Sequence, residues 1–124
     1  LAIVVALSSN KSSADFQMAE QGGKPLYQVV MEKMMSISTP DNMMFVVGAT
    51  KADKLAEIRK FCPDNFFLVP GVGAQGGSAE EVIAHGANAL GGLLINSSRG
   101  IIYASSGEDF AEAAGLAAAK TANL

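Results

Sequence analysis

Short apolar runs alternate four times with segments whose apolar residues recur at helical spacing, and this alternation restricts the possible folds more than any other feature. An apolar run without polar interruption is typical of a strand in a parallel sheet that is covered by helices. Strands that alternate with helices predict a parallel sheet with right-handed crossovers, and hence the α/β class. The predicted strands are residues 1–7, 43–49, 66–69 and 90–96.

Four strand–helix units fit two architectures. One is a small open sheet of the doubly wound type. The other is half of a (β/α)8 barrel, since a whole barrel takes about 250 residues and this chain has 124. The chain opens inside an apolar run without an initiator methionine, so we interpret it as the middle of a longer polypeptide.

Helix starts are indicated by a proline in the first turn and by Ser or Thr followed three positions later by an acid. The long polar stretch 9–24 predicts a loop with at most a short helical turn, and Pro25 then opens the first helix. The expected capping pairs are Thr50 with Asp53, Ser78 with Glu81, and Ser105 with Glu108. The expected buried stripes are Leu26, Val29, Val30 and Met34 in the first helix and Leu55, Ile58 and Phe61/Cys62 in the second, whose polar face carries Lys54, Glu57, Arg59 and Lys60.

Composition excludes several classes of function. Hydrophobic residues make up 49% and charged residues 17% of the chain, which is typical of a globular domain. The net charge of −3 and the lack of a Lys/Arg run argue against nucleic acid or an anionic membrane as partner. No apolar run is long enough to span a bilayer. The single cysteine, Cys62, allows no internal disulfide, which fits a reducing, cytoplasmic location.

The segment 70–77 (PGVGAQGG) carries four glycines in eight residues after the third predicted strand. Such a loop exposes backbone N–H groups beside a helix start, which favours an anion site over a plain tight turn. Gln75 supplies the only polar side chain. The glycines also match a dinucleotide fingerprint, but that motif should close the first strand and precede an acidic strand end, and here the next strand ends in Asn96.

Arg99 follows the fourth predicted strand, which is otherwise apolar. A guanidinium there suits bidentate binding of phosphate or carboxylate, with Ser98 offering a hydroxyl and an N–H group; the alternative is a solvated or acid-paired arginine. The loops after the last two strands are the usual phosphate site of the barrel fold. Ser8–Asn10, after the first strand, can contact a polar heterocycle or form an ordinary turn. No cluster of metal-ligating residues is present, and His85 has no His or Cys partner.

Four motifs in this order and spacing resemble the orotidine 5′-monophosphate decarboxylase family: ALSSN with DFQ, FVVGAT, LVPGVGAQGG and INSSRGIIYA. The resemblance covers nearly the whole chain. It implies that residues 1–124 form the C-terminal half of a single TIM (β/α)8 barrel, strands five to eight, with the N-terminal half absent from this chain.

The resemblance also implies roles for individual residues. Ser9 aligns with the residue that meets the pyrimidine edge, and Pro70 begins the loop that closes over the substrate. Gln75 spans the pyrimidine side and the phosphate, while Arg99 and the N–H groups at Ser98 and Arg99 bind the phosphate dianion. Two departures are visible: Lys11 stands where many relatives have proline, and Ser98 where some have glycine.

By the same resemblance, the intact enzyme removes CO₂ from orotidine 5′-monophosphate to give uridine 5′-monophosphate in pyrimidine biosynthesis, with no metal or organic cofactor and as a homodimer. The family's catalytic Asp–Lys–Asp network lies in a D-x-K-x-x-D motif that this chain lacks, so no catalytic residue is expected here and the chain alone is expected to be inactive. Two alternatives remain open: a sugar-phosphate decarboxylase of the same superfamily, and a non-catalytic nucleotide-binding α/β module.

Overall fold

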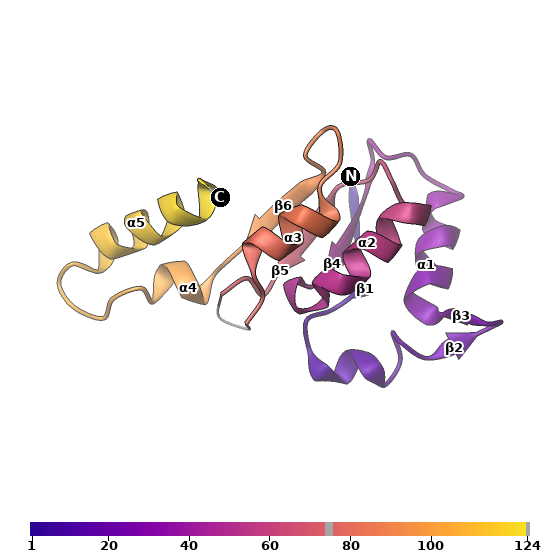
Figure 1. Ribbon diagram of the computed structural model, residues 1–124, viewed down its shortest axis with the longest axis horizontal. Coiled ribbons are helices and arrows are strands. Elements are labelled where there is room, and N and C mark those ends of the chain that lie inside the picture. The colour runs from indigo at the N-terminus through magenta and orange to yellow at the C-terminus, as the bar shows by residue number, and fades with distance from the viewer. Residues whose placement is uncertain (74–75, 124) are drawn as a thin grey trace.

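The computed structural model describes residues 1–73 and 76–123, and its centre is a four-stranded parallel sheet (Figure 1). The strands are β1 (Ala2–Leu7), β4 (Met43–Val47), β5 (Phe67–Pro70) and β6 (Leu93–Asn96). They lie side by side in chain order, and Pro70 is opposite Asn96 at the carboxyl edge. The fourth strand is three residues shorter than expected, because residues 88–91 form a turn closed by hydrogen bonds between Asn88 and Gly91.

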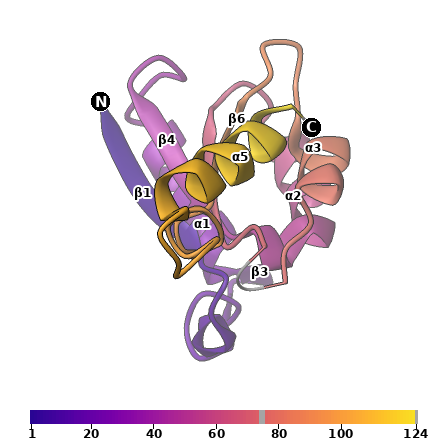
Figure 2. The same cartoon turned by 90° about the vertical axis from the view of Figure 1, so that its left-hand side faces the viewer.

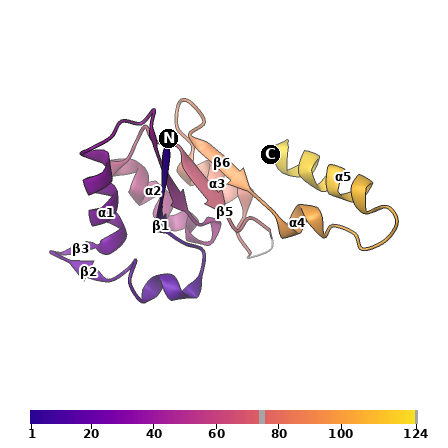
Figure 3. The ribbon, with the colours of Figure 1, turned by 180° about the vertical axis from the view of Figure 1, so that it is seen from behind.

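The strand order decides between the two architectures. Parallel strands that follow one another in space in chain order, joined by crossovers of one hand, place every connecting helix on the same face of the sheet. An open doubly wound sheet instead reverses its order and carries helices on both faces. Helices α1 (Leu26–Met35), α2 (Ala52–Phe61) and α3 (Ala79–Gly86) lie along one face of the sheet (Figures 1 and 3). The arrangement is that of a barrel segment.

The hydrophobic core lies between these three helices and the sheet. Its fully buried members include Phe45, Val47, Phe67 and Val69 from the strands and Met31, Leu55, Ile58 and Val82 from the helices. The stripe expected for α2 is confirmed. The stripe expected for α1 is confirmed only at Met34, which is half-buried and packs against the core. Tyr27 and Met31 are the buried residues of this helix, whereas Leu26, Val29 and Val30 are half-buried.

On the opposite face of the sheet, apolar side chains of the two edge strands are exposed. Ile3 and Val5 of β1 are 50% and 60% exposed, and Leu94 of β6 is 51% exposed. In a closed barrel this face points to the interior, where side chains from all the strands fill the space.

A short hairpin occupies part of the stretch expected to be a loop. After the 3₁₀ turn Lys11–Ala14, strands β2 (Glu20–Gln21) and β3 (Lys24–Pro25) pair antiparallel. Gly22 and Gly23 form the two-residue turn with φ of 62° and 79°, the conformation such a turn requires. Pro25 was expected to be the first residue of the first helix, but its backbone is extended and α1 begins at the next residue, Leu26.

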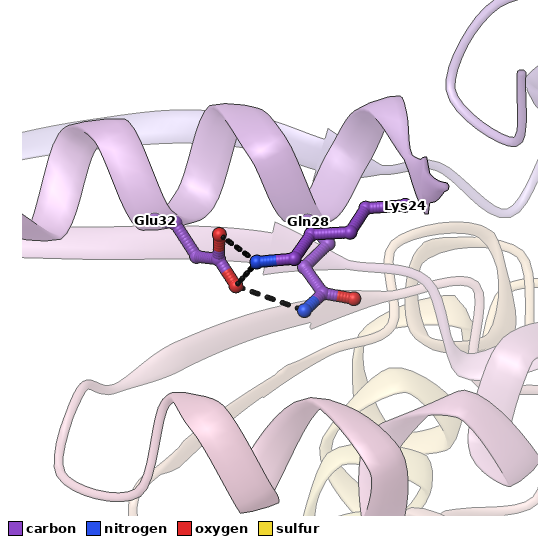
Figure 4. Close-up of polar contacts among 3 residues, drawn as sticks. All are labelled: Lys24, Gln28 and Glu32. Carbon is purple, nitrogen blue, oxygen red and sulfur yellow. Dashed lines mark hydrogen bonds and ion pairs between the residues drawn. The ribbon is translucent and has the colours of Figure 1, made fainter. Parts of the chain in front are cut away.

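The hairpin is attached to α1 by a polar group of three residues (Figure 4). Lys24 Nζ lies 2.8 Å from Glu32 Oε2, and Gln28 Nε2 donates to Glu32 Oε1 at 2.9 Å. The hydrogen bond from Lys24, supported by that from Gln28, lowers the pKa of the Glu32 carboxyl below its usual 4.5.

The last two helices, α4 (Arg99–Ile102) and α5 (Phe110–Ala122), lie beyond β6, and α5 runs back so that its C-terminal end is near that strand (Figures 1 and 2). α5 has no buried residue, and Phe110 and Leu116 are largely exposed. The capping pair expected at 105 and 108 is wrong: Ser105 Oγ donates to Asp109 Oδ1 at 2.6 Å and accepts from Gly107 N–H at 3.0 Å, so a serine turn precedes the helix. None of the helices in the described ranges is long and apolar enough to cross a membrane.

Arg59 of α2 was expected on the polar face of its helix and instead joins three elements. Its guanidinium donates to the carbonyls of Gly86, Asn65 and Gly92 at 2.6, 2.6 and 2.8 Å. It also lies 3.8 Å from the centre of the Phe67 ring, a cation–π distance. Helix periodicity could not reveal this, because the acceptors come from the end of α3 and from the loops before β5 and β6.

Candidate functional site

A pocket of about 150 Å³ opens at the carboxyl ends of β5 and β6. Three of the five predicted site residues, Pro70, Ser98 and Arg99, line it. The rest of the lining is Gly71, Val72, Asn96 and Ser97. The pairing of Pro70 with Asn96 brings the two loops together, because neighbouring parallel strands end at the same edge. The loop after β5 and the loop after β6 therefore lie next to each other in the structure.

The glycine-rich loop reverses direction at once after β5. Gly71 has a φ of 93°, which L-amino acids with a side chain rarely adopt. The loop then folds back on itself: Gly77 N–H donates to the Gly71 carbonyl at 3.3 Å, and Gly73 N–H donates to the Gly77 carbonyl at 3.0 Å. Gln75, the fourth predicted site residue, lies outside the described residues.

Arg99 begins a helical turn where the sequence predicted only a loop. The Ser98 carbonyl accepts from the N–H groups of Ile101 and Ile102, at 3.1 and 2.8 Å. The N–H groups of Arg99 and Gly100 have no carbonyl acceptor within the turn, as is usual for the first residues of a helix. The Arg99 side chain is exposed and, among the residues that the structure describes, forms neither an ion pair nor a hydrogen bond. The turn therefore presents a guanidinium and backbone N–H donors at the pocket.

Ser9, the fifth predicted site residue, reaches this region from β1. Its hydroxyl donates to the Pro70 carbonyl at 3.0 Å, and its own carbonyl accepts from Thr50 Oγ1 at 3.1 Å. The N–H of Ser8 donates to Gln17 Oε1 at 2.7 Å. The loops after β1, β4 and β5 are thus linked in series at the carboxyl edge.

The role that the sequence predicted for Thr50, as the cap of α2, is wrong. Thr50 was expected to cap α2 together with Asp53, but it lies in the 3₁₀ turn Ala49–Lys51, and α2 begins at Ala52 without a side-chain cap. The capping pair of α3 is confirmed in part, since Ser78 Oγ accepts from Glu81 N–H at 3.3 Å. Ser97, whose hydroxyl donates to the Val72 carbonyl at 3.1 Å, was not singled out. Its only sequence signal is its place between Asn96 and Ser98.

The other reactive groups lie away from the pocket. Cys62 is fully buried, and burial raises the pKa of its thiol to about 11, so it remains a neutral thiol near pH 7. His85 is exposed in the last turn of α3. Asp53 and Lys54 lie on α2, and Lys54 pairs with Glu57 of the same helix.

Pocket and sheet together define the class of the protein. Four parallel strands in chain order, helices on one face and a pocket made by consecutive βα loops are the features of a (β/α)8 barrel, whose sites lie at the carboxyl ends of the strands. The family model described as "Orotidine 5'-phosphate decarboxylase / HUMPS family" matches residues 1–114. The chain belongs to this family.

Individual relatives agree with this membership. The chain is 57% identical over 116 residues to an orotidine 5'-phosphate decarboxylase of Christiangramia forsetii, covering 94% of this chain and 43% of that protein. It is 54% identical over 112 residues to the protein of the same name from Flavobacterium johnsoniae, covering 90% and 41%. The structure of Leishmania donovani UMP synthase superposes with a TM-score of 0.79 at 38% identity, covering 97% of this chain and 27% of that one. The chain spans about two fifths of the length of the two curated relatives.

Proposed function

We propose that this chain is the phosphate- and pyrimidine-binding part of an orotidine 5′-monophosphate decarboxylase, an enzyme that releases CO₂ and uridine 5′-monophosphate. The observation that carries the proposal is the exposed Arg99 beside the glycine-rich loop in one pocket at the carboxyl ends of β5 and β6. Loops after consecutive barrel strands that offer N–H groups and a guanidinium form a suitable phosphate site. The names of the two bacterial relatives support the same activity.

Within this proposal, Arg99 binds two oxygens of the phosphate dianion, and the N–H groups that begin α4 bind it as well. Pro70 and the glycine-rich loop form the opposite wall, and Gln75 reaches from that loop to the phosphate and the pyrimidine side. Ser9 meets the pyrimidine edge. Binding energy gathered at the phosphate, remote from the reacting carbon, then helps to close the loops and to lower the barrier.

The catalytic groups belong, in this proposal, to residues outside the 124 described by this sequence. Decarboxylation leaves negative charge on a ring carbon, which calls for a positioned cation and a proton donor. Arg99 cannot release a proton near neutral pH. An Asp–Lys–Asp network on strands two and three of the barrel would supply both functions, with residues 1–124 as the C-terminal half of the barrel domain. The intact enzyme is proposed to act as a homodimer in the cytoplasm.

The test is the substitution Arg99→Ala in the intact enzyme. Loss of a charge-assisted bidentate contact should cost at least about 2 kcal/mol in kcat/KM, or about 30-fold. The affinity for uridine 5′-monophosphate should fall by a similar factor while that for uridine stays unchanged. Lys120→Ala, in the last turn of α5, is the control and should leave both affinities unaltered. Unchanged kinetics in the Arg99 variant would refute the phosphate site.

A further inference from the structure

The base of the glycine-rich loop is held from two sides by serine hydroxyl groups. Ser9 Oγ, from the chain after β1, donates to the Pro70 carbonyl at 3.0 Å. Ser97 Oγ, from the chain after β6, donates to the Val72 carbonyl at 3.1 Å. Between the two acceptors lies Gly71, whose φ of 93° marks the point where the backbone turns.

The surroundings of Ser97 leave its hydroxyl group room to point at the Val72 carbonyl. Ser97 lines the pocket that contains Arg99 and also a second cavity of about 330 Å³, between β6 and α5, that includes Ile95 and Ile101. A Cβ atom at Gly100 would lie 2.8 Å from Ser97 Oγ. The absence of a side chain at position 100 therefore leaves the hydroxyl free to point at the Val72 carbonyl.

The hydrogen bond from Ser97 to the Val72 carbonyl restrains more of the loop than Val72 alone. Val72 forms a bridge with Gly77, and Gly76 N–H donates to the Gly73 carbonyl at 2.9 Å. Because the two limbs of the loop are hydrogen-bonded to each other, fixing one limb also fixes the other. Glycines at 71, 73, 76 and 77 give this segment more conformational freedom than other residues would, so an external tether limits the positions it can take.

We propose that Ser97 is a positioning residue for phosphate recognition: its hydroxyl holds the glycine-rich loop at the distance from Arg99 that a phosphate group requires. Ser97 acts through the Val72 carbonyl and does not itself need to touch the nucleotide. The inference rests on the proposed function, because it assigns the two loops to one phosphate site.

The experiment compares Ser97→Thr with Ser97→Val in the intact enzyme, since threonine and valine have nearly the same shape and differ in the hydroxyl group. Affinities for uridine 5′-monophosphate and for uridine are measured by titration calorimetry, and KM and kcat by uridylate release. The valine variant should bind the nucleotide about fivefold more weakly, the factor expected for one hydrogen bond. Its KM should rise more than its kcat falls, its uridine affinity should stay unchanged, and the threonine variant should remain within about twofold of wild type.

Ser97→Ala decides the test if the valine variant does not fold, and it should match the valine prediction. Ser36→Ala is the matched control, because Ser36 Oγ makes the same kind of bond, to the Lys33 carbonyl at 2.7 Å, beyond the far end of α1. Equal losses of nucleotide and nucleoside affinity, or equal behaviour of the threonine and valine variants, would overturn the role of Ser97. If Arg99→Ala weakens uridylate binding while the Ser97 variants do not, the proposed function stands and this inference fails. If Arg99→Ala has no effect, the phosphate site itself fails.

Discussion

Arg59 shows how far the surroundings of one residue can differ from its sequence context. It lies between Ile58, which is fully buried, and Lys60, which is exposed. Its side chain reaches the end of α3 and the loops before β5 and β6, where burial lowers the pKa of the guanidinium and five backbone carbonyls accept from it. An arginine remains charged even so. The ends of α2 and α3 and the starts of β5 and β6 are thereby joined through one planar cation.

Arg59→Ala should therefore destabilise the protein by about 3 kcal/mol, since it removes charge-assisted hydrogen bonds and leaves half-buried carbonyls without a donor. Arg59→Lys should recover only part of this loss, because an ammonium group cannot match the planar fork. Urea unfolding monitored by circular dichroism measures the change. Lys60→Ala is the neighbouring control and should alter stability by less than about 0.5 kcal/mol. Equal midpoints for the Arg59 and Lys60 variants would show that the carbonyl cluster contributes nothing.

At the scale of elements, the strand ends are positioned by close backbone packing as well as by side chains. Gly48 follows β4, and its N–H donates to the Leu7 carbonyl at 2.7 Å. A Cβ at Gly48 would lie 2.7 Å from Ser9 Cα, closer than a Cβ atom approaches a non-bonded carbon atom. Gly77 meets Ala49 in the same way, with its Cβ position 3.0 Å from the Ala49 carbonyl carbon. The loops after β1, β4 and β5 are thus packed without room for additional atoms.

Gly48→Ala should push Ser9 away from β4 and break its hydrogen bond to Pro70. We expect destabilisation of about 1–3 kcal/mol, as for other overpacked sites, together with weaker nucleotide binding. Gly115→Ala provides the control: nothing lies within 4 Å of its Cβ position in α5, and alanine favours a helix, so stability should rise slightly. Thermal unfolding and uridylate titration report the two effects. A Gly48→Ala protein with unchanged stability and affinity would contradict the packing described here.

The stability that the contact between the hairpin β2–β3 and α1 contributes should depend on pH. The pKa of Glu32 is lowered in the folded state, chiefly by its hydrogen bond from Lys24, so its contribution to stability is present above the unfolded value of 4.5. It is lost as the pH falls through the lower folded-state pKa. The stability difference between wild type and Glu32→Gln should accordingly shrink as the pH is lowered from about 6 to about 3.5. Adding Lys24→Gln to the Glu32→Gln protein should introduce no further pH dependence in this range; a pH-independent difference for the single variant would argue against the pair.

At the scale of the whole molecule, the exposed apolar side chains on one face of the sheet and the exposed helix α5 have the same cause. Ile3, Val5 and Leu94 face away from the helices, and Phe110 and Leu116 have little to pack against. β1 and β6 are also edge strands with unpaired backbone groups. A closed barrel satisfies both edges and fills the interior, which four strands cannot do.

The 124-residue chain by itself should therefore associate through its edges or aggregate, and it should not decarboxylate orotidine 5′-monophosphate. Size-exclusion chromatography and a uridylate-release assay on material free of host enzyme measure these outcomes. Supplying the first four strand–helix units of a relative, in cis or in trans, should restore activity. Turnover of the isolated chain within about tenfold of an intact enzyme would show that its catalytic groups lie in these 124 residues.

The sequence by itself determined the order of strands and helices, the parallel sheet and the meeting of two loops at its carboxyl edge. These follow from local patterns: apolar runs for the strands, helical periodicity for Leu55 and Ile58, and glycine density for the loop after Pro70. The resemblance then identified the family and the remaining strands of the barrel, which no local pattern contains. Membership of Pro70, Ser98 and Arg99 in one pocket could be predicted because neighbouring parallel strands end side by side.

Only the tertiary structure decided which hydroxyl and guanidinium groups hold the loops in place. Thr50, Ser97 and Arg59 donate to the carbonyls of Ser9, Val72 and Gly92, each more than 20 residues away in the chain, and nothing at the donors' own positions marks the acceptor. The serine turn at Ser105 and the displaced stripe of α1 have a similar origin, because side-chain hydrogen bonds and packing outweighed a weak local preference. Local sequence sets what each segment can form, whereas the partner of a polar side chain depends on which segments the fold brings within about 3 Å of it.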